Sequence, residues 1–422
     1  MNSVHEAVNA ARVNVENEKP YTVGGEANLS RVKLIIVGGF LGAGKTTAIL
    51  GIAKHYMRFG LKVGIVTNDQ GGGLVDLEYL RANGLETLAV EGGCFCCNFD
   101  EFTQKVAEFK RIGGADVVLA EPVGSCTDLV ATIFKPLNVD RARSLGSFSK
   151  SFKLAPLSVV VDPKRVKRLM MQEAGGDRER AVDIPRAGGA IGDAGKNDGL
   201  EAFPTEVNYL FDRQLREAAI IAVNKCDLLS QAEAGEIIAF MREKYQGADV
   251  LPISAKTGDG LADWIGRFSD AGFAPGAPMD VDYGAYAKAE ASLGWLNMTC
   301  GLASEVARDF NKMAAEYMEA VREKLRAANA EIAHLKCFCV ARGGHFKASV
   351  TGLHEPLDID AESPAPQDAA NLYVNARANI APPALKEICE SALDMAFAGV
   401  SLSGVATECF APAPPRPTHR IP

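Results

Sequence analysis

Short runs of apolar residues alternate with longer amphipathic stretches through the first 270 or so residues of the chain. A short aliphatic run between polar residues is typical of a buried strand, and a longer amphipathic stretch is typical of a helix. Their repeated alternation predicts an α/β fold: a doubly wound, mostly parallel sheet with helices on both faces. The apolar runs cover residues 32–37, 63–67, 117–120, 157–161, 220–223 and 250–253.

The pattern changes in the last third of the chain, where one long helical segment is followed by several strand-like segments. This order predicts a second, smaller α+β domain with helices on one face of a sheet. Its acidic, proline-containing segment 355–370 predicts a loop. The predicted elements are a strand within 286–300, a helix over 305–332, strands over 334–342, 346–351 and 372–378, and a helix over 383–397.

A chain of 422 residues fits two domains joined by irregular segments. Glycines and charges without an apolar period predict a flexible insert, prolines and glycines predict a linker, and the proline-rich end predicts a disordered tail. The predicted organisation is a polar leader (1–30), a first domain (31–270) with an insert at about 170–204, a linker (271–282), a C-terminal domain (283–410) and a disordered tail (411–422).

Charge and cysteine content narrow the class of protein. The formal net charge is −8 without a dense Lys/Arg stripe, which disfavours nucleic acid and anionic membranes as partners. No run approaches the roughly 18 apolar residues of a membrane span, and the polar start lacks the apolar stretch of a secretory signal. Ten cysteines, three of them clustered, favour reduced thiols over a disulfide framework. We therefore expect a cytoplasmic protein.

Residues 39–46, Gly-Phe-Leu-Gly-Ala-Gly-Lys-Thr, fit the pattern G-x-x-x-x-G-K-[ST] between a predicted strand and a predicted helix. The glycines let the backbone fold around phosphate oxygens, and the helix N-terminus adds partial positive charge. Lys45 is suited to reach the outer phosphates and Thr46 to ligate Mg²⁺. The sequence therefore predicts a nucleotide-binding phosphate loop.

Two later motifs indicate that the nucleotide is GTP rather than ATP. Asn224-Lys225-Cys226-Asp227 follows a predicted strand, and the Asp227 carboxylate can accept from the two N–H donors of guanine, which adenine lacks. Lys225 can cover the base, and Asn224 can tie this loop to the phosphate loop. Ser254-Ala255-Lys256 follows the next strand and can contact the guanine oxygen.

Carboxylates at strand ends are candidates for catalysis. Glu121 ends a predicted strand and can hold Mg²⁺ through water, while Gly124 can meet the γ-phosphate and move after hydrolysis. Asp69 is a second candidate for Mg²⁺ or water positioning, with a plain loop acid as the alternative. The candidate nucleotide-binding residues are Gly39, Gly42, Ala43, Gly44, Lys45, Thr46, Thr47, Gly124, Asn224, Lys225, Asp227, Ser254, Ala255 and Lys256.

Three thiols, Cys94, Cys96 and Cys97, lie within four residues after two glycines. Thiolates select soft or borderline ions such as Zn²⁺ or Cu(I), and a tetrahedral Zn²⁺ site needs one more ligand. The alternatives are buried small side chains or a redox pair. Cys337 and Cys339 point to one face of a predicted strand, which favours core packing over metal binding.

Taken together, the phosphate loop, Gly93-Cys94-x-Cys96-Cys97, Glu121-x-x-Gly124 and Asn224-x-x-Asp227 resemble, in this order, the CobW-like GTPases. These are relatives of the urease and hydrogenase nickel-insertion GTPases. The resemblance implies slow GTP hydrolysis with Mg²⁺ and a metal, zinc or another thiophilic ion, at the three cysteines. It also implies a metallochaperone role, zinc- or cobalamin-related, toward a client metalloprotein, and dimerisation across the nucleotide is common among relatives.

Departures from the family pattern keep other functions open. Asn68-Asp69-Gln70-Gly71 stands where the family usually has Asn-Glu-Phe-Gly, and the His-rich loop of many zinc-handling members is missing. The alternative function is a GTP-driven chaperone of a corrinoid protein or a methyltransferase, in which the thiols are structural. A third is a redox-regulated protein that retains nucleotide but barely hydrolyses it.

Overall fold

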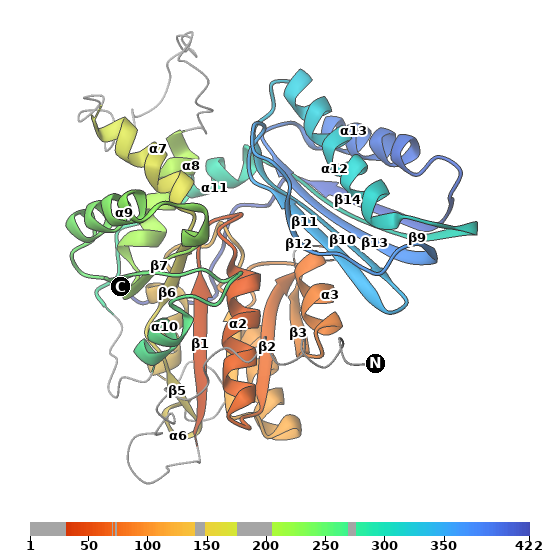
Figure 1. Cartoon of the computed structure of the whole chain (residues 1–422). Helices are drawn as coiled ribbons and strands as arrows, with labels where there is room; N and C mark the ends of the chain where they lie inside the picture. Colours follow the sequence, from red (N-terminus) through yellow and green to blue (C-terminus); the bar gives the residue numbers. More distant parts are fainter. Residues whose placement is uncertain (1–30, 70, 72–73, 140–147, 175–204, 269–275) are drawn as a thin grey trace, which may run out of the picture. The chain divides into compact units, whose positions relative to one another are not determined.

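The computed structural model describes residues 31–69, 71, 74–139, 148–174, 205–268 and 276–422, which contain two sheets (Figure 1). The first sheet has eight strands in the order β3-β2-β4-β1-β6-β7-β8, with β5 also paired to β1. All its pairings are parallel. Its strands are β1 (Val32–Gly38), β2 (Val63–Asp69), β3 (Glu86–Glu91), β4 (Val117–Glu121), β5 (Phe152–Leu154), β6 (Ser158–Val161), β7 (Ile220–Val223) and β8 (Asp249–Pro252).

Helices cover both faces of this sheet, which confirms the predicted doubly wound architecture. Successive side chains of a strand point to opposite faces, and β1 divides accordingly: Leu34 and Ile36 join one hydrophobic core, and Ile35 and Val37 join another. The helical segments are α2 (Lys45–Arg58), α3 (Val75–Ala82), α4 (Phe99–Glu108), η1 (Phe109–Gly113), η2 (Val130–Phe134), α5 (Lys135–Asn138), α6 (Phe148–Ser151), α7 (Pro163–Ala174), α8 (Thr205–Arg216), η4 (Cys226–Leu228), α9 (Gln231–Lys244) and α10 (Leu261–Arg267).

The second sheet has six antiparallel strands in the order β12-β11-β10-β13-β9-β14. Its strands and helices are α11 (Tyr283–Ala291), β9 (Gly294–Arg308), α12 (Phe310–Ala327), β10 (Ile332–Ala341), β11 (Gly344–Val350), β12 (Asp358–Ala361), β13 (Gln367–Ala378), α13 (Pro382–Ala396) and β14 (Ser401–Phe410). Helices α12 and α13 share one core with this sheet. The predicted smaller domain with helices against a sheet is therefore present.

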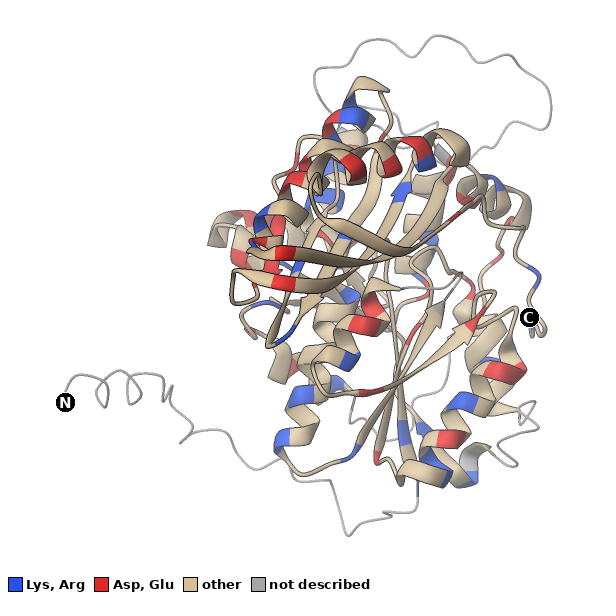
Figure 2. Ribbon diagram, turned by 90° about the vertical axis from the view of Figure 1, so that its right-hand side faces the viewer, with Lys and Arg blue, Asp and Glu red and all other residues tan. Residues whose placement is uncertain are grey.

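The two sheets are joined through helix α3. Phe338 of β10 belongs to the core of the first sheet, and its ring lies 6.0 Å from that of Tyr79 on α3. Lys, Arg, Asp and Glu lie mostly on helices, while the strands carry few of them (Figure 2). Burial of strand side chains against helices explains that distribution.

Several sequence expectations need correction. Strands β3, β5, β12 and β14 were not predicted, because their polar or short sequences lack a clear apolar run. The segment 355–370, predicted as a loop, contains β12 and the start of β13, since edge and antiparallel strands tolerate polar residues. The strand expected within 286–300 is present as the start of β9, preceded by helix α11, which ends at Ala291. The insert prediction falls mainly on residues 175–204, which lie outside the described residues, while 170–174 complete helix α7.

The C-terminal segment 411–422 is not disordered as its proline content predicts. Thr418 N–H donates to the carbonyl oxygen of Cys96 at 2.8 Å, and Arg420 Nε lies 2.7 Å from Oδ2 of Asp128. Proline disfavours helices and strands, but an extended chain can still dock through its remaining polar groups.

The helices of the described part of the chain were also compared with the length and apolar character that a membrane span requires. None of them meets both requirements.

Candidate functional site

The phosphate loop connects β1 to α2 in a backbone conformation that depends on glycine. Gly44 has φ 89°, and a Cβ atom there would lie 2.4 Å from Nδ2 of Asn224. Glycine is therefore required both by the left-handed backbone and by the close approach of the later loop. Helix α2 begins at Lys45, so its free N–H groups and positive dipole end face the loop.

Two carboxylates converge on the first turn of α2. The hydroxyl oxygen of Thr46 lies 2.8 Å from Oδ1 of Asp76 and 3.1 Å from Oε1 of Glu121. Glu121 was expected here because it ends β4. Asp76 was not, since it lies in the first turn of α3 without a recognisable motif.

The two carboxyl groups differ in protonation. Burial, helped by the nearby charge of Asp76, raises the pKa of Glu121 to about 7. Burial acts in the same direction on Asp76, but the ion pair with Lys336 outweighs it and lowers the pKa of Asp76 to about 2. Asp76 is therefore the permanently charged member of the pair.

These oxygen atoms suit a magnesium ion. Mg²⁺ prefers carboxylate, hydroxyl and water oxygens beside phosphate groups. Oε2 of Glu121 is buried without a hydrogen-bond partner, and a buried polar atom of this kind needs a counterpart. The donor set of Thr46, Asp76 and Glu121 therefore fits a divalent cation at the foot of the phosphate loop.

The loops after β7 and β8 are tied to the phosphate loop. Nδ2 of Asn224 donates to the carbonyl oxygen of Ala43 at 2.9 Å, and its Oδ1 accepts from Ala255 N–H at 2.8 Å. Ser254 donates to Oδ1 of Asp227 at 2.6 Å. The Asn224 side chain thus joins three loops at the carboxyl ends of parallel strands, where ligands of such sheets bind.

A single cavity collects most of the predicted nucleotide-binding residues. It lies between the phosphate loop, the loops after β7 and β8, and strands of the second sheet. Its walls include Gly42, Gly44, Lys45, Thr46, Thr47, Glu121, Asn224, Lys225, Asp227, Ala255 and Lys256.

The remaining predicted residues stand around this cavity. Gly124 lines an adjoining cavity with Lys45 and Glu121. Gly39, Ala43 and Ser254 are not in the walls; Ala43 and Ser254 act through the hydrogen bonds to Asn224 and Asp227. The side chain of Asp69 lies outside what the structure describes.

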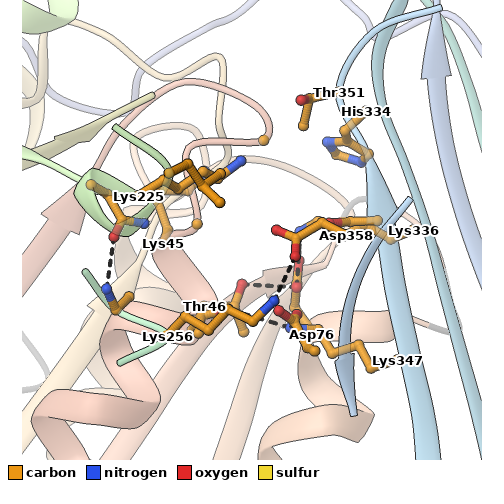
Figure 3. Close-up of a pocket in the computed structure, with 18 of the residues that line it drawn as sticks. Lys45, Thr46, Asp76, Lys225, Lys256, His334, Lys336, Lys347, Thr351 and Asp358 are labelled. Carbon is orange, nitrogen blue, oxygen red and sulfur yellow. Dashed lines mark hydrogen bonds and ion pairs between the residues drawn. The ribbon is translucent and has the colours of Figure 1, made fainter. Parts of the chain in front are cut away.

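The second sheet supplies the opposite wall of the cavity, which sequence motifs gave no means to predict. His334 and Lys336 of β10 and Lys347 of β11 face the side chains of the phosphate loop across it (Figure 3). Lys336 donates to both oxygens of Asp76, at 2.9 and 2.7 Å. Lys256 pairs with Asp358 of β12 at 2.9 Å. The second sheet thus contributes two lysines and two aspartates to the cavity, and each of these lysines is paired with a carboxylate.

The three clustered thiols converge in space. The sulfur of Cys94 lies 2.9 Å from that of Cys96 and 3.1 Å from that of Cys97, and the other two sulfurs are 4.0 Å apart. Cys94 and Cys96 are buried and Cys97 is half-buried. They form a potential metal-ligand group, the one found among the described residues. Three free thiols at this spacing are a suitable donor set for Zn²⁺ or another thiophilic ion.

A fourth thiol, Cys126, lies outside this group of three but interacts with two of its members, and it carried no sequence pattern. It follows Gly124 on the loop after β4, is 2% exposed, and interacts through its sulfur with Cys94 and Cys96. Those hydrogen bonds lower the pKa of Cys126 to about 6, while the contact with Cys126 raises the pKa of Cys96. The group therefore shares protons among its sulfurs.

Cys337 and Cys339 pack in the hydrophobic core under α12 and α13. Both are almost fully buried, and burial raises the pKa of each thiol. His345, near them in sequence, lies against the rings of Tyr79 and Phe338 instead. Core packing, the favoured interpretation from sequence, is what the structure contains.

The chain is similar to several known proteins. A relative described as zinc chaperone CobW, from a Sinorhizobium species, is 27% identical over 211 residues, which span 48% of this chain and 53% of that protein. Hydrogenase maturation factor HypB from Archaeoglobus fulgidus covers 56% of this chain and 88% of its own (18% identity, TM-score 0.33). Zn(II)-bound YjiA GTPase from E. coli covers 88% and 99% (14% identity, TM-score 0.32).

A family model decides the assignment. The model of the CobW/HypB/UreG nucleotide-binding domain matches residues 33–252, more than half of the chain. The match begins in β1, ends in β8, and includes the phosphate loop, the thiol cluster and the Asn224 loop. The chain therefore belongs to the CobW/HypB/UreG family.

Proposed function

We propose that this protein is a GTPase whose cycle controls a zinc ion, or another thiophilic ion, held by Cys94, Cys96 and Cys97 for delivery to a client protein. One observation carries the proposal: the loop after β4 borders both sites. Glu121 at its start lines the nucleotide cavity, and Cys126 further along forms side-chain hydrogen bonds with Cys94 and Cys96. A change at one end of such a short loop is transmitted to the other end.

In this proposal the backbone of the phosphate loop receives the phosphates, and Lys45 neutralises their charge. Thr46, Asp76 and Glu121 hold Mg²⁺, which supplies charge stabilisation at the transferring phosphoryl group. Asp227, oriented by Ser254, accepts the guanine N–H groups. Gly124 contacts the γ-phosphate and moves when that phosphate is lost.

The metal half of the cycle rests on the thiols. Their chemistry supports a borderline or soft ion, and the similar protein named as a zinc chaperone supports zinc as the first candidate. A ligand that binds one nucleotide state better shifts the protein toward that state. We propose that GTP favours metal retention and that hydrolysis favours release to the client.

The proposal also covers location and assembly. The ten free cysteines suit a reducing cytoplasm. A homodimer across the nucleotide is part of this proposal.

Phosphate release from GTP by the purified, zinc-loaded protein with Mg²⁺ tests the enzymatic half. Lys45→Ala and Asp76→Asn should each lower the rate by about 100-fold or more, the usual effect of losing a transition-state charge partner. Glu78→Gln, on the same helix but paired with Arg81, is the matched control. A wild-type protein that neither binds nor hydrolyses GTP overturns the proposal.

A second function has one observation in its favour. Cys94 and Cys96 are buried, as structural thiols are, which suits a GTP-driven chaperone of a corrinoid protein or a methyltransferase. The triple variant Cys94→Ser, Cys96→Ser, Cys97→Ser separates the two. Loss of client activation together with loss of zinc supports delivery, whereas client activation without bound metal supports the second function.

A further inference from the structure

His334 is a buried side chain of the second sheet that has no role in the proposed function so far. It is 7% exposed, and its Nδ1 has no hydrogen-bond partner among the described residues. Burial, followed by the positive charges of Lys336 and Arg377, lowers the pKa of His334 well below its usual value. The imidazole is therefore neutral, and a neutral imidazole offers one nitrogen as a hydrogen-bond acceptor.

Strand β10 is fixed against the phosphate loop on both sides of His334. On one side, a Cβ atom on Gly42 would lie 3.5 Å from the carbonyl oxygen of Ala333. On the other side, Lys336 Nζ lies 2.7 Å from Oδ2 of Asp76. Residues two apart on a strand point to the same face, so His334 and Lys336 share the face that borders the cavity. Figure 3 shows His334 on the wall opposite Lys45.

The nucleotide cavity continues past the phosphate loop into the adjoining cavity. Lys45, Glu121 and His334 are among the residues that line both. Asn224 and Asp227, from the loop predicted to bind the base, line the first cavity and not the second. The adjoining cavity therefore lies beyond the phosphate end of a bound nucleotide.

Hydrolysis requires a water molecule at that end. The attacking water, the γ-phosphorus and the leaving oxygen lie roughly in line, so the water approaches from the side of the γ-phosphate that faces away from GDP. Buried polar atoms without a partner gather on this side, and such atoms mark a place for water or a polar ligand. Those of the described residues that line the adjoining cavity are Thr67 Oγ1, Asn68 Oδ1, Glu121 Oε2, Trp295 Nε1 and His334 Nδ1.

Of these five atoms, Nδ1 of His334 is the best placed to orient the attacking water. Trp295 Nε1 can only donate a hydrogen bond. Thr67 and Asn68 of β2 and Glu121 of β4 belong to the first sheet, as the phosphate loop does, and the proposed function assigns Glu121 to Mg²⁺. His334 is the acceptor of this set that comes from the opposite wall.

Resting on the proposed function, we propose that Nδ1 of His334 accepts a hydrogen bond from the attacking water and holds it in line with the γ-phosphate of GTP. The water oxygen bonds to the γ-phosphorus while the bond from that phosphorus to the bridging oxygen breaks. The bridging oxygen leaves with the electron pair as part of GDP, and the water proton passes to the phosphate product. The second sheet thus takes part in hydrolysis, because it carries the group that positions the nucleophile.

Two measurements on the full-length protein with Mg²⁺ test this inference: the hydrolysis rate constant for GTP, and the dissociation constant of a GTP analogue that resists hydrolysis. His334→Phe keeps a ring but removes the acceptor. Its rate constant should fall by about 100-fold or more, the usual effect of losing a positioned acid–base group, with unchanged affinity for the analogue. His334→Asn, whose amide oxygen can take the place of Nδ1, should recover part of the lost rate.

His345→Phe is the matched control, because His345 packs against the rings of Tyr79 and Phe338 and lines neither cavity. Its rate constant should equal that of the wild type. His334→Leu replaces His334→Phe if the latter fails to fold. A wild-type rate in the variant without an acceptor, or a rate that falls only as far as analogue affinity falls, overturns the inference and leaves the proposed function intact. A wild-type protein that neither binds nor hydrolyses GTP contradicts the proposed function itself.

Discussion

Lys336 Nζ lies 2.7 Å from Oδ2 of Asp76, and the other oxygen of the same carboxylate lies 2.8 Å from the hydroxyl of Thr46. A lysine of the second sheet thus places its positive charge on a carboxylate that points at the phosphate loop. Its ammonium group competes with any divalent cation for Asp76. The C-terminal sheet therefore influences the nucleotide site directly and is not only a covering layer.

Removing this lysine should make magnesium bind more readily. In Lys336→Gln we expect half-maximal GTP binding at a several-fold lower Mg²⁺ concentration than in the wild type, because one competing cation is gone. A Mg²⁺ titration of fluorescent GTP binding measures it. Lys312→Gln is the control, since Lys312 pairs with Glu316 on α12 and lines neither cavity. An unchanged Mg²⁺ requirement in Lys336→Gln would show that the ion pair does not compete.

Sequence motifs predicted the site residues that directly follow a strand of the parallel sheet. Lys45, Thr46 and Asn224 come together because each directly follows a strand of one parallel sheet, and the carboxyl ends of such strands share an edge. Glu121 follows from the same rule.

The residues that were missed come from elements whose positions depend on tertiary packing. Asp76 reaches the site through the path of α3, Cys126 through the loop after β4, and Lys336 through an antiparallel sheet 260 residues away in sequence. The docked tail escaped prediction because proline content reports on regular structure and not on contacts made by an extended chain.

Asp227 should determine base preference. With Asp227→Asn we expect GTP affinity to fall by about tenfold to a few hundredfold, the usual effect of losing a hydrogen bond to a charged group, and xanthosine triphosphate to become the better ligand. The amide donates where guanine also donates, whereas xanthine offers an oxygen. Competition binding with the two nucleotides measures the ratio, and a variant that still prefers GTP would exclude Asp227 from base recognition.

Magnesium binding should depend on pH through Glu121. The folded-state pKa of this carboxyl is raised to about 7, chiefly by burial, with Asp76 adding to it and Lys45 and Lys336 opposing it. Below pH 7 a proton occupies the group, so Mg²⁺ must displace it, and apparent Mg²⁺ affinity should rise up to about tenfold per pH unit until pH 7 and then level off. Glu121→Gln should bind Mg²⁺ more weakly and without that slope. A wild-type slope that persists in the variant would assign the titration to another group.

The C-terminal segment should slow exchange of the bound ion. Thr418 Oγ1 donates to the carbonyl oxygen of Cys97 at 2.7 Å, and Arg420 pairs with Asp128, so the segment lies over the half-buried thiol. Deleting residues 411–422 should speed zinc transfer to a chelator by about tenfold or more. Arg420→Gln, which removes one anchor, should have a smaller effect in the same direction. Equal transfer rates in the full-length and shortened proteins would mean that the segment does not limit access.

The nucleotide site and the thiol site are proposed to be coupled, so that the bound nucleotide changes the affinity for zinc. The direct measurement is the Zn²⁺ dissociation constant of the wild-type protein, obtained by competition with a chromophoric chelator, in the presence of Mg²⁺ with GDP and with a GTP analogue that resists hydrolysis. The account predicts at least about tenfold tighter zinc binding with the analogue, a coupling of about 1.4 kcal/mol or more. Equal dissociation constants in the two states would contradict it, because a ligand with the same affinity for both states cannot shift either one.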